Sequence, residues 1–271
     1  MENICKEKLD IIIIAGQSNA EGYGVGPVDC EYAPSDKILW LRDDADAHFE
    51  QINDKDVLQL KENPEKTISV AEEPEGEFGK VGKLSLIFAK NYMNQYLKND
   101  RKILIVNCGV GGTGFARPEW GVGNVLHNRM IDMVSYALSL NSENKVVAFL
   151  WHQGECDSFE NADWDVDKKY TVHKNNLTNM INDVYSNIGG KVPFIAGGFC
   201  DEWYYTEKTA CDAILKAIRE VCLSFNGAFV ETKGLISNNQ RIANGDNIHF
   251  CRQSLYKLGE MYFAEYTKIA F

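Results

Sequence analysis

Two short motifs near opposite ends of the sequence could bring a hydroxyl together with an imidazole and a carboxylate. In the serine motif (residues 16–19, G-Q-S-N), Ser18 follows an apolar run, which places its hydroxyl at the end of an expected strand. In the histidine motif (residues 246–249, D-N-I-H), Asp246 stands three residues before His249. This spacing lets the carboxylate hold one imidazole nitrogen and leaves the other free as a base. Each has a structural alternative, since serine is a common helix N-cap and a lone histidine is usually structural.

The glycine loop (residues 109–114) follows a second apolar run and matches G-x-G-x-x-G literally. A dinucleotide site also needs a helix that opens at the third glycine and an acid-tipped second strand further on. Pro118 and two more glycines follow closely and disfavour a regular helix, and no such strand is evident. A glycine-rich loop can instead aim bare N–H groups at an oxyanion, and Gly111 and Gly112 are the candidates.

The glutamine motif (residues 151–157, W-H-Q-G-E-C-D) is unusually polar for a loop after a strand. Gln153 is a neutral amide donor suited to stabilising an oxyanion. His152 and Glu155 could suggest a metal pair, but no second H-x-x-x-H element supports one. The carboxylates of Glu155 and Asp157 could also cap the following helix, and this is the role we expect of Asp157.

The composition limits the partners. The chain has 271 residues, 45% of them hydrophobic and 25% charged, with a formal net charge of -11. Nucleic acids and anionic membrane surfaces attract basic proteins, so neither is an expected partner. Between Arg42 and Lys80 there are 12 acidic but only 5 basic residues. This stretch is too long for an ordinary connection, so we expect an acidic insertion or lid at about 42–80 within a single domain spanning 1–271.

The eight cysteines show neither C-x-x-C pairing nor finger-like spacing, so we expect no metal. The first residues lack a secretory pattern, and the apolar run 11–15 is too short for a signal sequence or a membrane span. We therefore expect reduced thiols in a cytoplasmic protein, an expectation that a trimmed signal peptide would remove. Cys108 and Cys156 lie beside or inside the motifs, and we expect their oxidation to impair activity.

The elements that position these motifs alternate along the chain. Apolar runs predict strands at 9–14, 37–41, 103–106, 146–151, 193–197 and 228–230. Helical spacing predicts helices at about 84–99, 127–140, 177–188, 214–225 and 254–269. This alternation predicts an α/β protein with three α/β/α layers and a central, mostly parallel sheet. Function in such sheets collects at the carboxyl ends of the strands, where the motifs would meet.

Together the motifs supply the parts of an acyl-transfer site. Ser18 would be the nucleophile, His249 the general base and Asp246 the acid that orients it. The oxyanion hole would use three donors, namely the N–H of Ser18, the N–H of Gly111 or Gly112, and the side chain of Gln153.

The same segments resemble a known family. G-Q-S-N at 16–19, G-G-T at 111–113, W-H-Q-G-E-x-D at 151–157 and D-x-x-H at 246–249 look like the four blocks of SGNH-type carbohydrate esterases. They are most similar to the sialate O-acetylesterase-like group, which includes the acetylxylan esterases of carbohydrate esterase family 6. The resemblance covers nearly the whole chain. It implies a flavodoxin-like fold and removal of acetyl groups from sugar hydroxyls without metal or cofactor.

The resemblance also assigns residues. It implies a triad of Ser18, Asp246 and His249, and an oxyanion hole with Gly112 and Gln153, for which Gly111 is a neighbouring candidate. Gln153 stands where many relatives have Asn, a substitution usual in this subgroup. In some members the glutamate equivalent to Glu155 has been argued to be the acid partner of the histidine. Glu155 is therefore the alternate acid or a supporting residue.

The substrate rests on weaker features. Aromatic candidates for stacking on a sugar are Trp120, Trp151, Trp203, Tyr204 and Tyr205, although packing in the core or rim explains each as well. Arg117 could pair with the carboxylate of a sialic acid, or else form a salt bridge within its loop. An acidic insertion at the cleft would repel anionic sugars, so we expect neutral acetylated mono- or oligosaccharides.

Three other functions stay open. The first is specificity for 9-O-acetylated sialic acid. The second is a nucleotide-binding oxidoreductase that uses the glycine loop, and the third is a catalytically silent carbohydrate-binding protein. The oligomeric state is not readable from the sequence.

Overall fold

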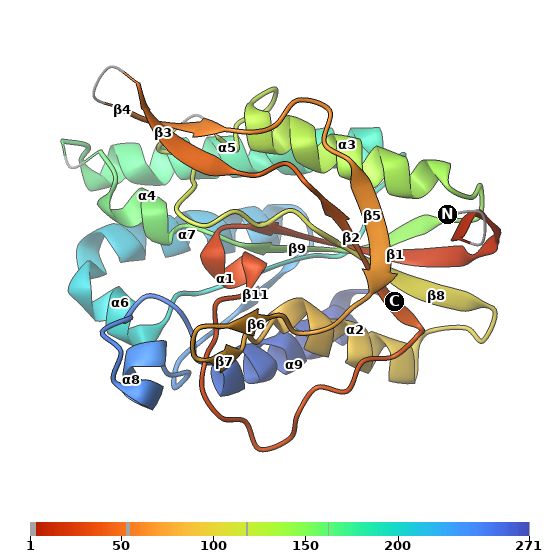
Figure 1. Cartoon of the computed structure of the whole chain (residues 1–271). Coiled ribbons are helices and arrows are strands. Elements are labelled where there is room, and N and C mark those ends of the chain that lie inside the picture. Colours follow the sequence, from red (N-terminus) through yellow and green to blue (C-terminus); the bar gives the residue numbers. More distant parts are fainter. Residues whose placement is uncertain (1–3, 53–54, 118, 162, 271) are drawn as a thin grey trace.

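The computed structural model has three layers, a central sheet between two layers of helices, and describes residues 4–52, 55–117, 119–161 and 163–270 (Figure 1). Pro118, invoked above against a helix after the glycine loop, lies outside these ranges. The described residues form a seven-stranded sheet in the order β11-β10-β9-β1-β8-β2-β5. Its strands are β1 (Lys8–Gly16), β2 (Ile38–Asp43), β5 (Lys66–Val70), β8 (Arg101–Asn107), β9 (Lys145–His152), β10 (Phe194–Gly197) and β11 (Ala228–Val230).

The pairing is parallel throughout, apart from β5, which runs antiparallel to β2 at the sheet edge. One face is covered by α3 (Val125–Ser139), α5 (Val166–Asn187) and α7 (Lys208–Ser224), and the other by α2 (Leu84–Gln95) and α9 (Arg252–Ile269). The predicted α/β/α architecture is confirmed. Within the described ranges, no helix has the length and apolar character needed to cross a membrane.

The central strand β1 shows why its sequence is an unbroken apolar run. Ile11 and Ile13 pack into the core beneath α3, α5 and α7, whereas Ile12 and Ile14 pack into the core beneath α2 and α9. Successive side chains of a strand point to opposite faces, so a strand covered on both sides needs apolar residues at every position. All four isoleucines are fully buried.

The helix boundaries differ from the predicted ones mainly at their ends. The helix expected at 84–99 ends at Gln95, and the long helix recognised from residue 177 already begins at Val166, where Asp165 caps it by accepting the N–H of Lys168 at 2.8 Å. Several short helices were not predicted: η1 (Ile4–Lys6), α1 (Ser18–Glu21), α4 (Glu155–Phe159), α6 (Asp201–Thr206) and α8 (Asn238–Ile242).

The acidic stretch at 42–80 is partly built into the sheet. Its strand β5 pairs with β2, and the residues in between form a hairpin of β3 (His48–Ile52) and β4 (Lys55–Gln59). A smaller pair, β6 (Glu75–Gly76) and β7 (Gly79–Lys80), follows. Figure 1 shows the hairpin at the end of the sheet where β1 leads into α1. We call residues 43–66 the insertion from here on.

Candidate active site

Ser18 lies at the sharp exit of β1. At Gly16 the backbone has φ 131°, and a Cβ there would lie 2.0 Å from the carbonyl oxygen of His152, so only glycine fits. The N-cap of α1 is Gln17, so Ser18 is not the cap but the first helical residue. Within the described part of the chain, the Ser18 hydroxyl makes no hydrogen bond, and the residue is 4% exposed.

His249 is held by Asp246. Nδ1 of the imidazole lies 2.8 Å from Oδ2 of Asp246, and Asn238 donates to the same oxygen at 2.8 Å. Partial burial opposes ionisation, but the hydrogen bonds from His249 and Asn238 outweigh it and lower the pKa of Asp246. An ionised carboxylate only accepts hydrogen bonds, so Nδ1 carries the proton and Nε2 is left as a base.

Asn19 joins the serine motif to the histidine motif. Its amide nitrogen donates to the carbonyl of Ile248 at 3.3 Å, and its amide oxygen accepts the N–H of Phe250 at 3.1 Å. The residue after Ser18 thus fixes the backbone on both sides of His249. This clamp therefore brings the serine motif and the histidine motif together at the end of β1.

Glu155 contacts Asn19 and not His249. Its Oε1 accepts a hydrogen bond from Asn19 at 2.8 Å and lies 3.6 Å from Nε2 of His152. Glu155 is fully buried, which disfavours its charge, but hydrogen bonds from His152 and Asn19 still lower its pKa. The carboxylate therefore orients Asn19, while the contact to the imidazole of His249 is made by Asp246.

Gln17 joins the serine motif to the glutamine motif. Its side-chain oxygen accepts the N–H groups of Gly154 at 3.3 Å and Cys156 at 3.1 Å. It also accepts the amide of Gln153 at 3.4 Å, and that amide donates to the carbonyl of Thr113 at 3.3 Å as well. Gln153 is fully buried, and both of its contacts are long for N–H···O hydrogen bonds.

The glycine loop lies against Ser18, and its two candidate oxyanion donors differ in whether their N–H groups are already hydrogen-bonded. A Cβ on Gly111 would lie 3.5 Å from Cβ of Ser18. The N–H of Gly111 donates to Oε2 of Glu21 at 3.0 Å, so this donor is occupied, contrary to its expected oxyanion role. The N–H of Gly112 makes no hydrogen bond to any described residue, and its φ of 69° suits glycine. Among the described residues, the first helix after Gly114 is α3, which begins only at Val125.

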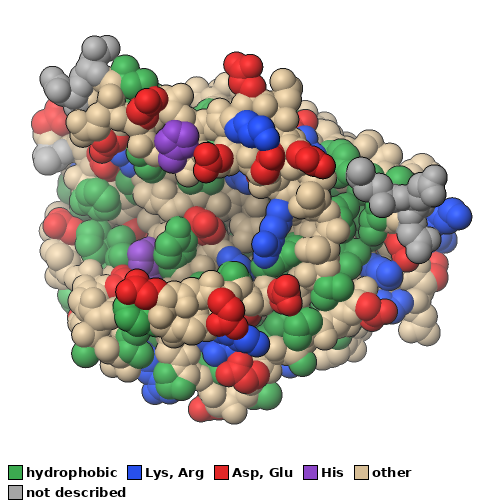
Figure 2. All heavy atoms as spheres, viewed as in Figure 1, with side chains coloured by type: hydrophobic (Ala, Val, Ile, Leu, Met, Phe, Trp, Pro, Cys, Tyr) green, Lys and Arg blue, Asp and Glu red, His purple; other side chains and the backbone are tan. Residues whose placement is uncertain are grey.

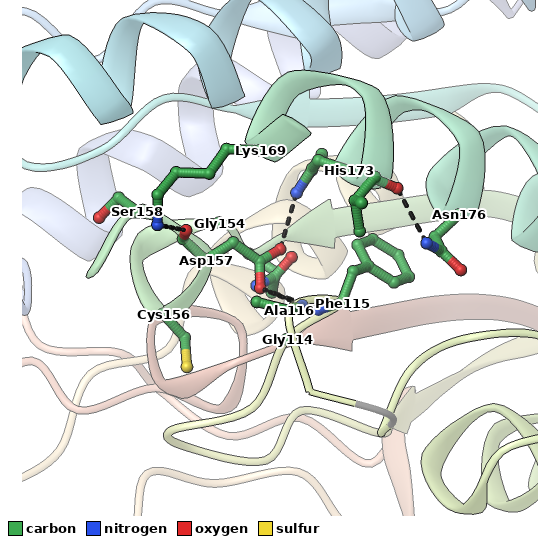
Figure 3. A network of polar contacts seen from close by, with 12 residues as sticks. Gly114, Phe115, Ala116, Gly154, Cys156, Asp157, Ser158, Lys169, His173 and Asn176 are labelled. Atoms are coloured by element: carbon green, nitrogen blue, oxygen red, sulfur yellow. Dashed lines mark hydrogen bonds and ion pairs between the residues drawn. The ribbon is translucent and has the colours of Figure 1, made fainter. Parts of the chain in front are cut away.

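A buried network fixes the far side of the glycine loop (Figure 3). Oδ1 of Asp157 accepts the N–H groups of Phe115 and Ala116, both at 2.9 Å, and Oδ2 lies 2.8 Å from Nδ1 of His173. The expected capping role of Asp157 is wrong, because the N-cap of α4 is Gly154 and no side chain caps this helix end among the described residues. Asp157 instead ties the loop to α4 and, through His173, to α5.

With this geometry, comparison with known proteins identifies the family. The model of the family described as "carbohydrate esterase, sialic acid-specific acetylesterase" matches residues 8–268. The chain belongs to this carbohydrate esterase family. It is therefore a carboxylic ester hydrolase, as the resemblance implied. No curated protein sequence matches it.

Solved structures agree with the fold of this esterase. The crystal structure of NanS superposes with a TM-score of 0.74 at 18% identity, covering 97% of this chain and 98% of that one. A protein from Arabidopsis thaliana gives 0.69 at 22% identity, covering 96% and 98%. A carbohydrate acetylesterase from Xanthomonas citri gives 0.58 at 14% identity, covering 96% of this chain and 56% of that one.

Two substrate-binding predictions for this esterase are wrong. Trp120 and Trp151 are both fully buried, and their rings pack edge to face with centroids 5.2 Å apart. The indole N–H of Trp120 donates to the hydroxyl of Thr113 at 2.9 Å. Both side chains belong to the core beneath the glycine loop, so neither can stack on a sugar.

The other predicted binding side chains have varied surroundings. Arg117 pairs with Glu119 at 3.2 Å and Glu160 at 3.6 Å, and it donates to the carbonyl of Gly112, which is the loop salt bridge given above as its alternative. Trp203 is partly buried and packs edge to face on Phe159. Tyr204 donates to Asp212 at 2.6 Å, while Tyr205 is exposed.

Some side chains of this site carried no predicted role. Tyr23, 43% exposed, stacks on the imidazole of His249 with ring centroids 5.1 Å apart and planes at 22°. Gln17 and Asn19 belong to the G-Q-S-N block, so the resemblance already indicated that these positions matter. Tyr23 and Glu21 fall just beyond the block, and no spacing rule indicates them.

The esterase offers little thiol chemistry near its site. Cys108 and Cys156 are buried, and burial raises the pKa of the Cys108 thiol to about 12 and that of Cys156 further still. A buried thiol with a raised pKa is a poor nucleophile and a poor target for oxidants. Among the described residues, no group of His, Cys, Asp and Glu side chains is arranged to hold a metal ion.

Proposed function

We propose that this protein is a serine esterase that removes O-acetyl groups from carbohydrates through Ser18, His249 and Asp246. The observation that carries the proposal is the double clamp of Asn19. The residue next to Ser18 bonds the backbone on both sides of a histidine whose Nδ1 is fixed by Asp246 at 2.8 Å. This arrangement supplies a free hydroxyl, a free Nε2 and an orienting carboxylate within one rigid unit.

The reaction proceeds in two steps. As Oγ of Ser18 bonds to the acetyl carbon, its proton moves to Nε2 of His249. The tetrahedral intermediate collapses when the bond to the sugar oxygen breaks, and that oxygen takes the proton from His249. Water then attacks the acetyl-enzyme while His249 accepts its proton, and acetate leaves as Oγ of Ser18 regains a proton.

The oxyanion forms beside the N–H groups of Ser18 and Gly112. These donors are backbone groups on fixed turns, which keeps the cost of reorganisation small. Gln153 supplies a third donor by exchanging one of its two long contacts for the oxyanion. Gly111 takes no part, because its N–H is bound to Glu21.

We propose neutral acetylated sugars as the substrates, with 9-O-acetylated sialic acid as the alternative that the family description favours. Arg117 supports the neutral choice, because Glu119 and Glu160 already pair with its guanidinium. Comparative kinetics on acetylated xylo-oligosaccharides and 9-O-acetyl sialic acid, with Arg117→Ala alongside, distinguish the two. A strong preference for the sialate that disappears in Arg117→Ala would reverse the choice.

The nucleophile is tested by covalent labelling. A fluorophosphonate probe should label Ser18, located by mass spectrometry, and Ser18→Ala should lose both labelling and hydrolysis of p-nitrophenyl acetate. Ser139→Ala, which removes an exposed serine at the end of α3, is the matched control. Near-wild-type turnover in folded Ser18→Ala would overturn the triad, and an unlabelled wild-type protein would favour the silent binding protein.

A further inference from the structure

A cavity of about 340 Å³ opens between the serine motif and the insertion. Small-molecule sites of proteins are typically clefts of roughly 300–1,000 Å³, so the volume suits a small ligand. Its lining includes Glu21, Tyr23 and Gly111 on one side and Asp43, Asp46 and Phe49 on the other. Figure 2 shows this face hollowed between α1 and the insertion, with acidic side chains along the edge above the hollow.

The cavity adjoins the reacting groups. A Cβ on Gly111 would lie 3.5 Å from Cβ of Ser18 and 3.5 Å from the hydroxyl of Tyr23. The ring of Tyr23 in turn stacks on His249. The lining therefore lies next to Ser18 at Gly111 and next to His249 at Tyr23.

The walls present apolar faces with polar edges. Tyr23 is 43% exposed and Phe49 is 37% exposed, so each leaves part of its aromatic surface open to a ligand. The guanidinium of Arg117 packs over the ring of Phe49, 4.8 Å from its centroid, and holds it against the glycine loop. Aromatic faces of this kind suit the C–H faces of a sugar ring.

The polar part of the lining is negative. Glu21, Asp43 and Asp46 supply three carboxylates, against the single guanidinium of Arg129. That guanidinium is paired with Asp43 through two hydrogen bonds of 2.8 and 2.7 Å, and the Asp43 side chain is only 1% exposed. The pair is neutral, so the carboxylates of Glu21 and Asp46 give the lining its negative charge. Carboxylates accept hydrogen bonds from sugar hydroxyls and repel a sugar carboxylate, so the lining selects by charge as well as by shape.

We propose that this cavity is the subsite for the sugar that carries the acetyl group, and that Asp46 and Phe49 of the insertion select neutral, hydroxyl-rich rings over anionic ones. The proposal rests on the proposed function, because it places the sugar relative to Ser18. It adds a reason for the acidity of the insertion, which the catalytic residues do not need.

The test compares insertion variants on three substrates: p-nitrophenyl acetate, an acetylated xylo-oligosaccharide and 9-O-acetyl sialic acid. We expect Phe49→Ala to lower kcat/KM on the oligosaccharide about tenfold more than on p-nitrophenyl acetate. We expect Asp46→Asn to raise kcat/KM for the sialate relative to the oligosaccharide about three- to tenfold, since roughly 1 kcal/mol of repulsion is removed. Phe78→Ala and Glu62→Gln, exposed positions outside the cavity lining, are the matched controls.

A binding measurement separates this proposal from the esterase mechanism. Calorimetric titration of Ser18→Ala protein with the acetylated xylo-oligosaccharide should show binding that weakens about tenfold when Phe49→Ala is added. If hydrolysis fails in the wild type but this binding difference persists, the mechanism is wrong and the subsite stands. If Phe49→Ala and Asp46→Asn behave like their controls in both kinetics and binding, the subsite is overturned.

Discussion

Two of the Asp–His pairs among the described residues share the same Nδ1–Oδ2 contact but have opposite surroundings. Asp246 and His249 meet at 2.8 Å with side chains 25% and 20% exposed, and Asn19, the residue after Ser18, bonds the backbone on both sides of His249. Asp157 and His173 meet at the same distance with side chains 4% and 1% exposed, and the other oxygen of Asp157 holds the loop amides. The bond alone therefore does not define a catalytic pair. The first pair is partly exposed and is the one that we propose for catalysis, whereas the second is buried and ties the glycine loop to α4 and α5.

The largest predicted effect comes from removing the imidazole of each pair. His249→Ala should lower kcat/KM for p-nitrophenyl acetate by about 10⁴-fold or more with little change in Tm, because it deletes the base. His173→Ala should lower Tm by several degrees, because it opens a cavity and leaves Asp157 without its partner. Kinetics and thermal unfolding on both variants check this. Loss of turnover of equal size in a well-folded His173→Ala protein would erase the distinction.

The next effect concerns which acid serves His249. Asp246→Asn should lower kcat by roughly 10³–10⁴-fold, since an amide in place of the carboxylate favours the wrong imidazole tautomer. Glu155→Gln should cost far less, about tenfold, because it contacts Asn19 and His152 and not His249. The two variants should be compared by single-turnover kinetics. A larger loss in Glu155→Gln would make Glu155 the acid.

The third prediction concerns the stability contributed by the buried pair. Asp157→Ala should destabilise the fold by about 3 kcal/mol, because it strands two loop N–H groups and a buried imidazole. Denaturant unfolding measures this free energy, and Asp163→Ala, which removes an exposed acid between α4 and α5, serves as the control. A loss below about 1 kcal/mol would show that water or another group replaces the carboxylate.

The smallest effect is the pH dependence of the exposed pair. The folded-state pKa of Asp246 is lowered from its ordinary 3.8, so its stabilising contribution is present above about pH 4 and is lost as the pH falls through the folded-state value. The contribution is below about 1 kcal/mol because the group is partly solvated. The difference in Tm between wild type and Asp246→Asn should therefore be positive at pH 7 and shrink as the pH is lowered below about 4. A difference that grows on acidification would contradict the sign.

The sequence predicts the regular parts of this molecule well, because they follow from local pattern. The unbroken run Ile11 to Ile14 specifies a strand buried on both faces. By contrast, β5 was missed, because its residues are half exposed and show no apolar run. It becomes a strand only through pairing with β2, which is a contact between segments that local pattern does not encode.

The site follows the same division. Ser18, Asp246 and His249 can be picked out because their residue types and spacings carry chemistry. The wrong assignments, Trp120 and Trp151, depend on burial, which a loop sequence does not specify. The predicted oxyanion role of Gly111 does not fit the structure, because Glu21 accepts its N–H. These two residues lie 90 positions apart in the sequence. The contact of Tyr23 with His249 could not be predicted for a similar reason, since the two residues lie far apart in the sequence.

The register of the edge strands has a consequence for how this enzyme can change over evolution. Asp43 on β2 pairs directly with Lys66 on β5, so the chain leaves the sheet and returns to it on the same rung. The segment in between begins and ends at neighbouring points, and its length is not set by the distance that it must span. Loop-closure entropy grows only slowly with length, so this segment can be lengthened, shortened or exchanged at a cost of a few tenths of a kcal/mol to about 1 kcal/mol. The fold thus allows this segment to be exchanged while β2 and β5 keep their pairing, and under our proposal such an exchange alters the sugar subsite without moving Ser18 or His249.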